Sequence, residues 1–341
     1  MITFYPGPSK VYPQVADYAA EAIRTGLTSL NHRSPGFMEI VRETIHLLHQ
    51  KLDIPADYHI AFVSSATECW EIVAQSLTAV GSTHPYTGAF GKKWMEYAHR
   101  ITPSTSAPAD TLCLVQNETS TGAQIPMEAL ADYRSTFEGL IAVDAVSSMA
   151  GIRLDWQRAD VWFASVQKCF GLPAGLAVLV YSPAALNRAQ AIGERNHYNS
   201  LLFIHENFSA YQTPYTPNGL GIYCLMRVLQ QVAPIAEIDT MTKRRAVDWY
   251  NFFDQGLPGA LGAFRPLIND TAKRSDTVIA IEGSETDIKA LKLAAQQAGI
   301  TLGNGYGNWK NTTFRIANFP AITDDEVDQL RRFLHTYRTG Q

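Results

Sequence analysis

Short apolar runs alternate with stretches of helical periodicity from about residue 15 to residue 230. This alternation constrains the fold most, because strands separated by helices pair in parallel through crossover connections. The expected strands are Ile60–Val63, Thr83–Tyr86, Thr111–Val115, Leu140–Val143, Val161–Ala164 and Ala177–Tyr181. The expected helices include Phe37–Leu52, Glu68–Val80 and Pro126–Phe137. The pattern therefore predicts an α/β fold whose large domain holds a mostly parallel, mixed sheet covered by helices.

A second, smaller unit is expected after a long helix at about Ile235–Gln255. The signals beyond it are a strand at Thr277–Ile281, a capping box at Ser284-x-x-Asp287 with a stop at Gly299, a strand at Thr313–Ala317, and a capping box at Thr323-x-x-Glu326. We predict a large domain over residues 15–234 and a smaller α+β domain built from residues 1–14 and 235–341.

Composition excludes several classes of protein. The 341 residues carry a net charge of −4 and no basic run, which argues against a nucleic-acid partner. Neither a membrane-spanning stretch of roughly 20 apolar residues nor a signal peptide is evident. The four cysteines lack C-x-x-C spacing, and His46 and His49 have no third ligand, so no metal is expected. We expect a cytoplasmic enzyme without a membrane partner.

Two of the expected strands lead to a charged residue. Asp144 ends the run that begins at Leu140, and Lys168 follows the run Val161–Ser165, before a turn-rich stretch. Such a lysine is either a solvated surface residue or one held for chemistry. Ligands of open α/β sheets collect beyond the carboxyl ends of strands. An amine for a Schiff base and an anion for a pyridine nitrogen are what pyridoxal phosphate requires.

Each of these two residues has a defined role if pyridoxal phosphate is the cofactor. Asp144 would keep the pyridine nitrogen protonated, through a charge-assisted hydrogen bond of about 1.5–3 kcal/mol. Lys168 would form the Schiff base and then move the proton from the substrate Cα. We therefore predict that Lys168 and Asp144 are the catalytic residues.

The phosphate of the cofactor needs a separate site. Strand Ile60–Val63 runs into Ser64-Ser65-Ala66-Thr67 and then into a helix, whose first N–H groups suit a phosphate dianion. Ser65, Ala66 and Thr67 are the candidate phosphate-binding residues. The alternative is an ordinary capped helix, because Ser65-x-x-Glu68 is itself a capping box.

Other residues are candidates for the ring and for the substrate. Phe90 follows a short strand and either stacks on the cofactor or packs in the core, whereas Thr119 is expected at the phenolic oxygen. Arg315, within an apolar strand, and Arg33 are candidates for anionic substrate groups, the alternative being surface ion pairs. The stretch Gly303–Gly307 is read as a flexible turn without a clear preceding strand.

Together these motifs resemble the class V aminotransferases of pyridoxal-phosphate fold type I. The resemblance rests on Ser64–Thr67, Asn117–Gly122, Val143–Ser148 and Ser165–Lys168, and it covers nearly the whole chain in the family's order. It implies amino-acid and 2-oxo-acid substrates and a homodimer with shared active sites.

Within that family the chain looks most like the phosphoserine branch, which serves serine biosynthesis. This closer resemblance rests on Gly171–Leu176 after the lysine and on Asn31-His32-Arg33-Ser34 near the start of the chain. This branch implies phosphoserine:2-oxoglutarate transamination, with His32 and Arg33 on the substrate phosphate and Arg315 on the α-carboxylate. It also implies cofactor-phosphate contacts from Gln167 and from Thr216 of the other subunit.

Some residues depart from the phosphoserine branch and keep other substrates open. Glu68 would repel a phosphorylated substrate if it pointed inward, but as a capping residue it would fold back on its helix. The Ser-Ala-Thr-x-x-x-Glu pattern is closer to alanine–glyoxylate and serine–pyruvate enzymes, Phe90 replaces a tryptophan, and Tyr215 replaces an asparagine. The alternatives are serine or alanine:glyoxylate (or pyruvate) transamination, 2-aminoethylphosphonate transamination, and a non-catalytic protein of the same fold.

Overall fold

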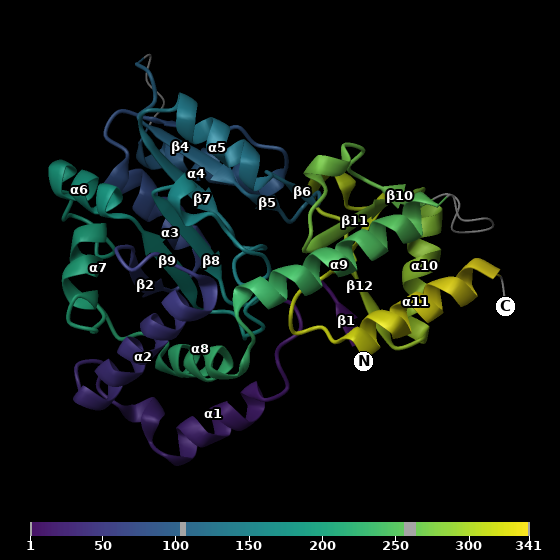
Figure 1. The fold of residues 1–341 in the computed structure, drawn as a ribbon, viewed down its shortest axis with the longest axis horizontal. Coiled ribbons are helices and arrows are strands. Elements are labelled where there is room, and N and C mark those ends of the chain that lie inside the picture. The colour runs from purple at the N-terminus through teal and green to yellow at the C-terminus, as the bar shows by residue number, and fades with distance from the viewer. Residues whose placement is uncertain (1, 103–106, 256–263, 340–341) are drawn as a thin grey trace.

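A computed structural model describes residues 2–102, 107–255 and 264–339 of the chain. The described residues form two main sheets, and helix α9 (Ile235–Asp254) packs against the smaller one (Figure 1). The larger sheet has the order β2 (His59–Val63), β9 (Ala177–Tyr181), β8 (Val161–Ser165), β7 (Leu140–Asp144), β4 (Thr111–Val115) and β3 (Ser82–Thr83).

The larger sheet is mostly parallel, as predicted. Strands β3, β4, β7 and β8 pair in parallel, whereas β9 is antiparallel to both β8 and β2. Strand β2 therefore points the same way as β8, and the carboxyl ends of β2, β4, β7 and β8 share one edge of the sheet. The prediction of a mixed, mostly parallel α/β sheet is confirmed.

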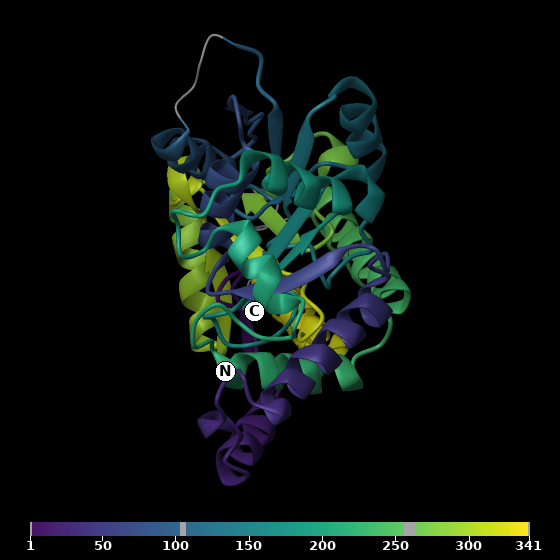
Figure 2. The ribbon, with the colours of Figure 1, turned by 90° about the vertical axis from the view of Figure 1, so that its left-hand side faces the viewer.

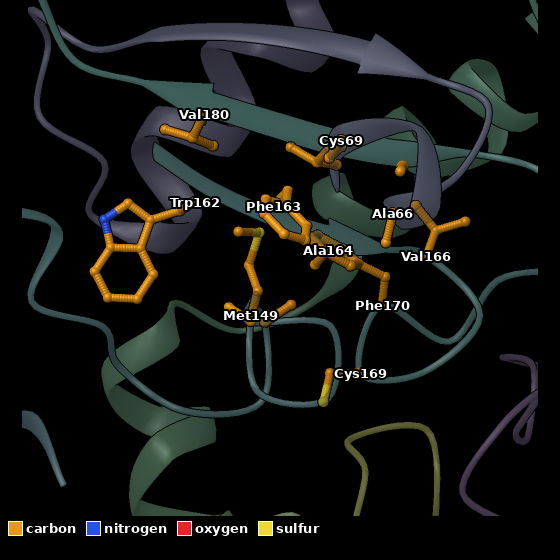
Figure 3. Close-up of a cluster of buried hydrophobic side chains, with 14 of the residues drawn as sticks. Ala66, Cys69, Met149, Trp162, Phe163, Ala164, Val166, Cys169, Phe170 and Val180 are labelled. Atoms are coloured by element: carbon orange, nitrogen blue, oxygen red, sulfur yellow. The ribbon is translucent and has the colours of Figure 1, made fainter. Parts of the chain in front are cut away.

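Helices cover this sheet, and its strands β4, β7, β8 and β9 are buried along their whole length. The helices are α1 (Val15–Arg24), α2 (Pro35–Leu52), α3 (Ala66–Ile72), α4 (Ala89–Ile101), α5 (Met127–Thr136), α6 (Pro183–Ile192), α7 (Leu201–Phe208) and α8 (Gly219–Gln231). Figure 3 shows the packing around Phe163 and Ala164 of β8, with Cys69 of α3 and Met149 nearby. Because strands buried on both faces cannot alternate apolar and polar residues, they read as continuous apolar runs. Figure 2 shows α1 and α2 from the side, at the lower end of the molecule.

The smaller sheet joins the two ends of the chain. Its order is β1 (Ile2–Phe4), β12 (Ile300–Asn304), β13 (Thr313–Ala317), β11 (Val278–Glu282) and β10 (Arg265–Pro266). Strand β1 pairs in parallel with β12, whereas the other pairs are antiparallel. Helices α10 (Glu285–Gln297) and α11 (Asp324–Thr339) lie in the same part of the molecule (Figure 1). The boundary predicted between residues 234 and 235 stays a prediction.

The helix expected at Glu68–Val80 is shorter than predicted. Helix α3 changes into a π-helical turn over Val73–Leu77 and stops before Thr78. The carboxylate of Asp110 accepts hydrogen bonds from the N–H groups of residues 79, 80 and 81, which replace helical bonds there. Apolar spacing could not reveal this long-range cap.

Two other expectations were also wrong. The strand expected at Thr83–Tyr86 is only Ser82–Thr83, because Pro85 has no N–H to donate to a neighbouring strand. The glycine-rich stretch Gly303–Gly307 does follow a strand, since Gly303 and Asn304 end β12. A Cβ at Gly303 would lie 2.5 Å from Pro6 Cδ and 2.8 Å from the carbonyl oxygen of Arg315, so close packing explains this glycine.

Within the described residues, no single helix has both the length and the apolar composition of a membrane span. Helices α8 and α9 meet those limits only as a pair bent by 83°.

Candidate active site

The shared strand edge brings the two predicted catalytic residues to one cavity. Asp144 is the last residue of β7, and Lys168 lies three residues beyond the end of β8. Both line a cavity of about 240 Å³. The other predicted site residues that line it are Ala66, Thr67, Phe90, Thr119 and Gln167.

The carboxylate of Asp144 is held in a fixed orientation. Trp70 Nε1 donates to Asp144 Oδ2 at 3.1 Å, and the backbone N–H of Val146 donates to Oδ1 at 3.0 Å. Burial raises the pKa of Asp144 to about 6, whereas these two hydrogen bonds and the charge of Lys168 act in the opposite direction. Asp144 is therefore a buried anion at neutral pH, placed to pair with a cationic ring nitrogen.

The amine of Lys168 lies beside Thr119. Lys168 Nζ donates to Thr119 Oγ1 at 2.8 Å, and Thr119 Oγ1 donates to Ser147 Oγ at 2.9 Å. Burial lowers the pKa of Lys168 to about 8, although Asp144 acts to raise it. A substantial share of the amine is consequently neutral near pH 8, as a nucleophile or a proton acceptor requires.

Phe90 is placed by a capped helix. The carboxylate of Glu118 accepts from the N–H groups of Phe90 at 3.1 Å and Gly91 at 3.0 Å, at the start of α4. A Cβ at Gly88 would lie 2.3 Å from Glu118 Cγ, so a glycine permits this approach. The ring of Phe90 lies 5.4 Å from Lys168 Nζ and packs on Tyr306, with centroids 5.0 Å apart. Phe90 thus both lines the cavity and packs against a neighbour.

At the start of α3, the structure assigns helix capping and cavity lining to different residues. Ala66 and Thr67 line the cavity, whereas Ser65 Oγ accepts from the N–H of Glu68 at 3.2 Å as an ordinary cap. The N–H of Ala66 donates to Ser165 Oγ at 3.1 Å. Ser65 itself does not line the cavity, so the first residue of this segment at the cavity is Ala66.

Glu68 folds back rather than lining the cavity. Its Oε2 accepts from the backbone N–H of Ser64 at 2.8 Å and from Ser64 Oγ at 2.5 Å, and its Oε1 accepts from Tyr198 at 3.1 Å and Tyr215 at 3.4 Å. The carboxylate thus reaches Ser64 instead of Ser65, one residue from the expected capping-box partner. Its charge is directed at hydroxyl groups.

Arg315 is a buried cation on β13 beside the cavity. Its Nη1 donates to the carbonyl oxygen of Thr119 and its Nε to that of Asn304, both at 2.6 Å. No carboxylate of the described residues lies within 4.0 Å of it, so it is not part of an ion pair there. Burial lowers its pKa. An anionic ligand would supply the missing counter-charge.

Besides Ser65 and Arg315, three further predicted residues do not line this cavity within one chain. His32 and the exposed Arg33 are in the loop that precedes α2, and the exposed Thr216 is between α7 and α8. None of them lines the cavity with Lys168. Their roles in phosphate binding remain predictions.

Sequence reasoning missed several residues of the site. Trp70 and Glu118 were not among the predicted site residues, although Trp70 holds Asp144 and Glu118 caps the helix that carries Phe90. Lys93, one helical turn after Phe90 on α4, lines the cavity, and its i, i+3 spacing was an available signal. Pro8 of the N-terminal segment also lines it, but no local pattern indicates this long-range contact.

The residues at this cavity fit pyridoxal phosphate. They offer a buried amine, a buried carboxylate, an aromatic side chain and the start of a helix, each from a different strand end of the larger sheet. Asn117 Oδ1, also at the cavity, is buried without a hydrogen-bond partner among the described residues. Such an unpaired acceptor next to the cavity is costly for the protein alone and indicates that the residues there are arranged for function rather than for stability.

Comparisons with known proteins agree with this chemistry. A phosphoserine aminotransferase structure from Cytophaga hutchinsonii is 30% identical and superposes with a TM-score of 0.91, covering 98% of both chains. A Thermus thermophilus aspartate aminotransferase structure has a TM-score of 0.83 at 22% identity, covering 98% of both chains, and shows the fold.

Curated sequences give the same result. The phosphoserine aminotransferase of Corynebacterium glutamicum (strain R) is 28% identical over 354 residues, which cover 95% of this chain and 91% of the relative. The family described as Aminotransferase class-V matches residues 93–330. The chain belongs to the class V aminotransferases, a family of pyridoxal-phosphate enzymes.

Proposed function

We propose that this enzyme transfers the amino group of phosphoserine to 2-oxoglutarate. One observation supports transamination most directly: Lys168 and Asp144 line one cavity, and Arg315 lies beside it without a counter-ion among the residues that the structure describes. The phosphorylated substrate is supported by the names of the relatives and by Glu68, which is turned toward hydroxyl groups.

Each residue of the cavity has a task in this reaction. When bound, pyridoxal phosphate supplies an aldehyde that condenses with amines and a ring that accepts electrons from the substrate Cα. Lys168 provides the amine that holds the cofactor and afterwards takes the proton from Cα at its Nζ. Asp144 keeps a proton on the ring nitrogen, because its carboxylate is fixed by Trp70 and Val146.

Other residues bind and orient. Phe90 offers a flat face for the ring, Thr119 is suited to the phenolic oxygen, and Ala66 and Thr67 offer the start of α3 to the cofactor phosphate. Gln167 lines the same cavity. Arg315 suits the α-carboxylate, because a guanidinium binds a carboxylate through two parallel hydrogen bonds.

We further propose that the active enzyme is a homodimer. His32, Arg33 and Thr216 lie outside the cavity of their own chain, so the roles predicted for them require a second subunit. In that arrangement Thr216 binds the cofactor phosphate of the partner, and His32 and Arg33 bind the phosphate of its substrate. Sedimentation of the holoenzyme as a monomer would contradict this assembly.

A panel of amino donors and acceptors tests the substrate. Phosphoserine, serine, alanine and 2-aminoethylphosphonate are each assayed with 2-oxoglutarate, pyruvate and glyoxylate. We expect the highest kcat/KM for phosphoserine with 2-oxoglutarate, and no turnover by the variant Lys168→Ala. A preference for serine or alanine with glyoxylate would refute the proposed substrate while leaving the aminotransferase chemistry intact.

The variant Arg33→Ala tests the phosphate contact itself. Removing one guanidinium that pairs with phosphate should raise the KM for phosphoserine by about 10- to 100-fold. The KM for serine should change by less than about twofold, since serine has no phosphate. Equal losses for both donors would mean that Arg33 acts on the structure and not on the phosphate.

A further inference from the structure

A second cavity, of about 530 Å³, lies outside the active site. It is lined by one face of α10, by β12 and by Tyr5, which follows β1. Figure 1 shows α10 and β12 in the smaller-sheet part of the molecule. On the helix, Lys289, Lys292 and Gln296 line it at i, i+3 and i+7, and therefore share one face. Lys310 lines it from the segment after β12.

The charge of this cavity is positive. Three lysines line it, at positions 289, 292 and 310, against a single acid, Glu285. Within the described chain none of the three lysines lies within 4.0 Å of a carboxylate oxygen. Lysines that gather around a cavity without acidic partners favour an anionic ligand.

The walls of the cavity also include apolar side chains. Ile288, Ile300 and Leu302 are buried in its lining, whereas Leu293 at its side is 57% exposed. An inorganic ion would make no apolar contact with these side chains. The lining suits an anion with a short carbon skeleton.

Hydrogen bonds connect the cavity to the active site. Lys292 Nζ donates to Asn304 Oδ1, and the carbonyl oxygen of Asn304 accepts from Arg315 Nε at 2.6 Å. Arg315 Nη1 donates to the carbonyl oxygen of Thr119, whose hydroxyl accepts from Lys168 at 2.8 Å. A ligand that draws Lys292 away from Asn304 therefore acts on the residue that holds Arg315.

We propose that this cavity binds a small organic anion bearing a carboxylate or a phosphate, and that its occupation changes the affinity of Arg315 for the α-carboxylate of the amino donor. Burial and the charge of Arg315 lower the pKa of Lys292, and the negative charge of an anion beside Lys292 would act in the opposite direction. The ligand class matches that of amino-acid and 2-oxo-acid metabolites, so the site would let such a metabolite regulate the enzyme.

Binding is tested on the holoenzyme by titration calorimetry, with inorganic phosphate and with succinate as probes in separate arms. The double variant Lys289→Met/Lys292→Met should bind the preferred probe about tenfold more weakly than the wild type. Lys310→Met should weaken the same binding. The matched control is Lys273→Met, because Lys273 pairs with Asp270 at 2.9 Å outside the cavity. Stronger binding of phosphate than of succinate, or the reverse, identifies the anionic group.

A kinetic measurement tests the connection to the active site. The probe should change the KM for the amino donor at least twofold in the wild type and in Lys273→Met, but not in the double variant. The visible absorbance of bound cofactor confirms that each variant is folded. The proposal would be overturned by unchanged calorimetric binding in the double variant, or by a KM of the wild type that is the same with and without the probe. Neither outcome depends on which amino donor the enzyme prefers.

Discussion

Replacing Trp70 by Phe tests how Asp144 is kept ionised. The indole N–H donates to Asp144 Oδ2 at 3.1 Å, and both side chains are buried. A hydrogen bond to a buried charge contributes about 1.5–3 kcal/mol, which is about 10- to 150-fold in the equilibrium between carboxylate and carboxylic acid. Losing it favours the protonated acid, which cannot pair with a protonated ring nitrogen.

The pKa of Asp144 is about 6 in the protein without cofactor, and pairing with a cationic ring nitrogen would lower it in the holoenzyme. At pH 7 about nine tenths of the carboxylate is ionised, and a tenfold change lowers this to about one half. We therefore expect Trp70→Phe to move the acidic limb of the pH profile of kcat/KM upward by about one to two pH units. Activity should recover at high pH, since the carboxylate ionises again there.

Trp94→Phe provides the matched control. Trp94 is fully buried, its ring stacks on that of Trp70 with centroids 6.2 Å apart, and its Nε1 has no hydrogen-bond partner among the described residues. The same change of side chain there removes packing but no hydrogen bond to Asp144. The reasoning is refuted if the acidic limb stays in place in Trp70→Phe, or if it moves equally in Trp94→Phe.

Further predictions concern the charged residues near the cavity. Burial lowers the pKa of Lys168 to about 8 in the folded protein. Its charge therefore destabilises the folded protein fully below pH 8, and this cost disappears as the pH rises past the pKa of the lysine in the unfolded chain. Cofactor-free Lys168→Met should therefore be more stable at pH 7 by about 1–3 kcal/mol in urea unfolding; a loss of stability would contradict this. For the same reason, the rate of cofactor uptake by the wild type should rise with pH and level off above about 8, as stopped-flow absorbance would show. Lys93→Met should raise the KM for a phosphorylated donor or weaken cofactor binding by about tenfold, whereas Lys92→Met, exposed and near Glu96, should change neither. Glu68→Gln should alter kcat/KM for phosphoserine by less than about twofold; a large gain would mean that Glu68 faces the substrate.

The sheet could be predicted from sequence because its strands are buried on both faces. Thr111–Val115 and Ala177–Tyr181 were predicted with the bounds that the structure has. A continuous apolar run of five residues between turns leaves few other structures open. Asp144 and Lys168 were found for a related reason, since a charge at the end of such a run is conspicuous.

Residues whose position depends on distant partners could not be predicted. Glu118 caps α4, which begins 29 residues earlier, at Ala89, and Asp110 caps the segment after α3. Tyr306 reaches Phe90 from the segment that follows β12 of the smaller sheet. Neither periodicity nor local capping patterns carry information on such contacts, because they depend on how the two sheets pack.

The residues that break local rules are also those that make the site work. Among the described residues, Arg315 is a buried cation without an acidic partner, Lys168 is a buried amine with a lowered pKa, and Asn117 Oδ1 is buried without a hydrogen bond. Each is unfavourable in the protein alone, because a buried polar group costs free energy until it is paired. Pyridoxal phosphate would bond to Lys168 and a substrate carboxylate would pair with Arg315, so their binding should stabilise the fold as well as permit the reaction.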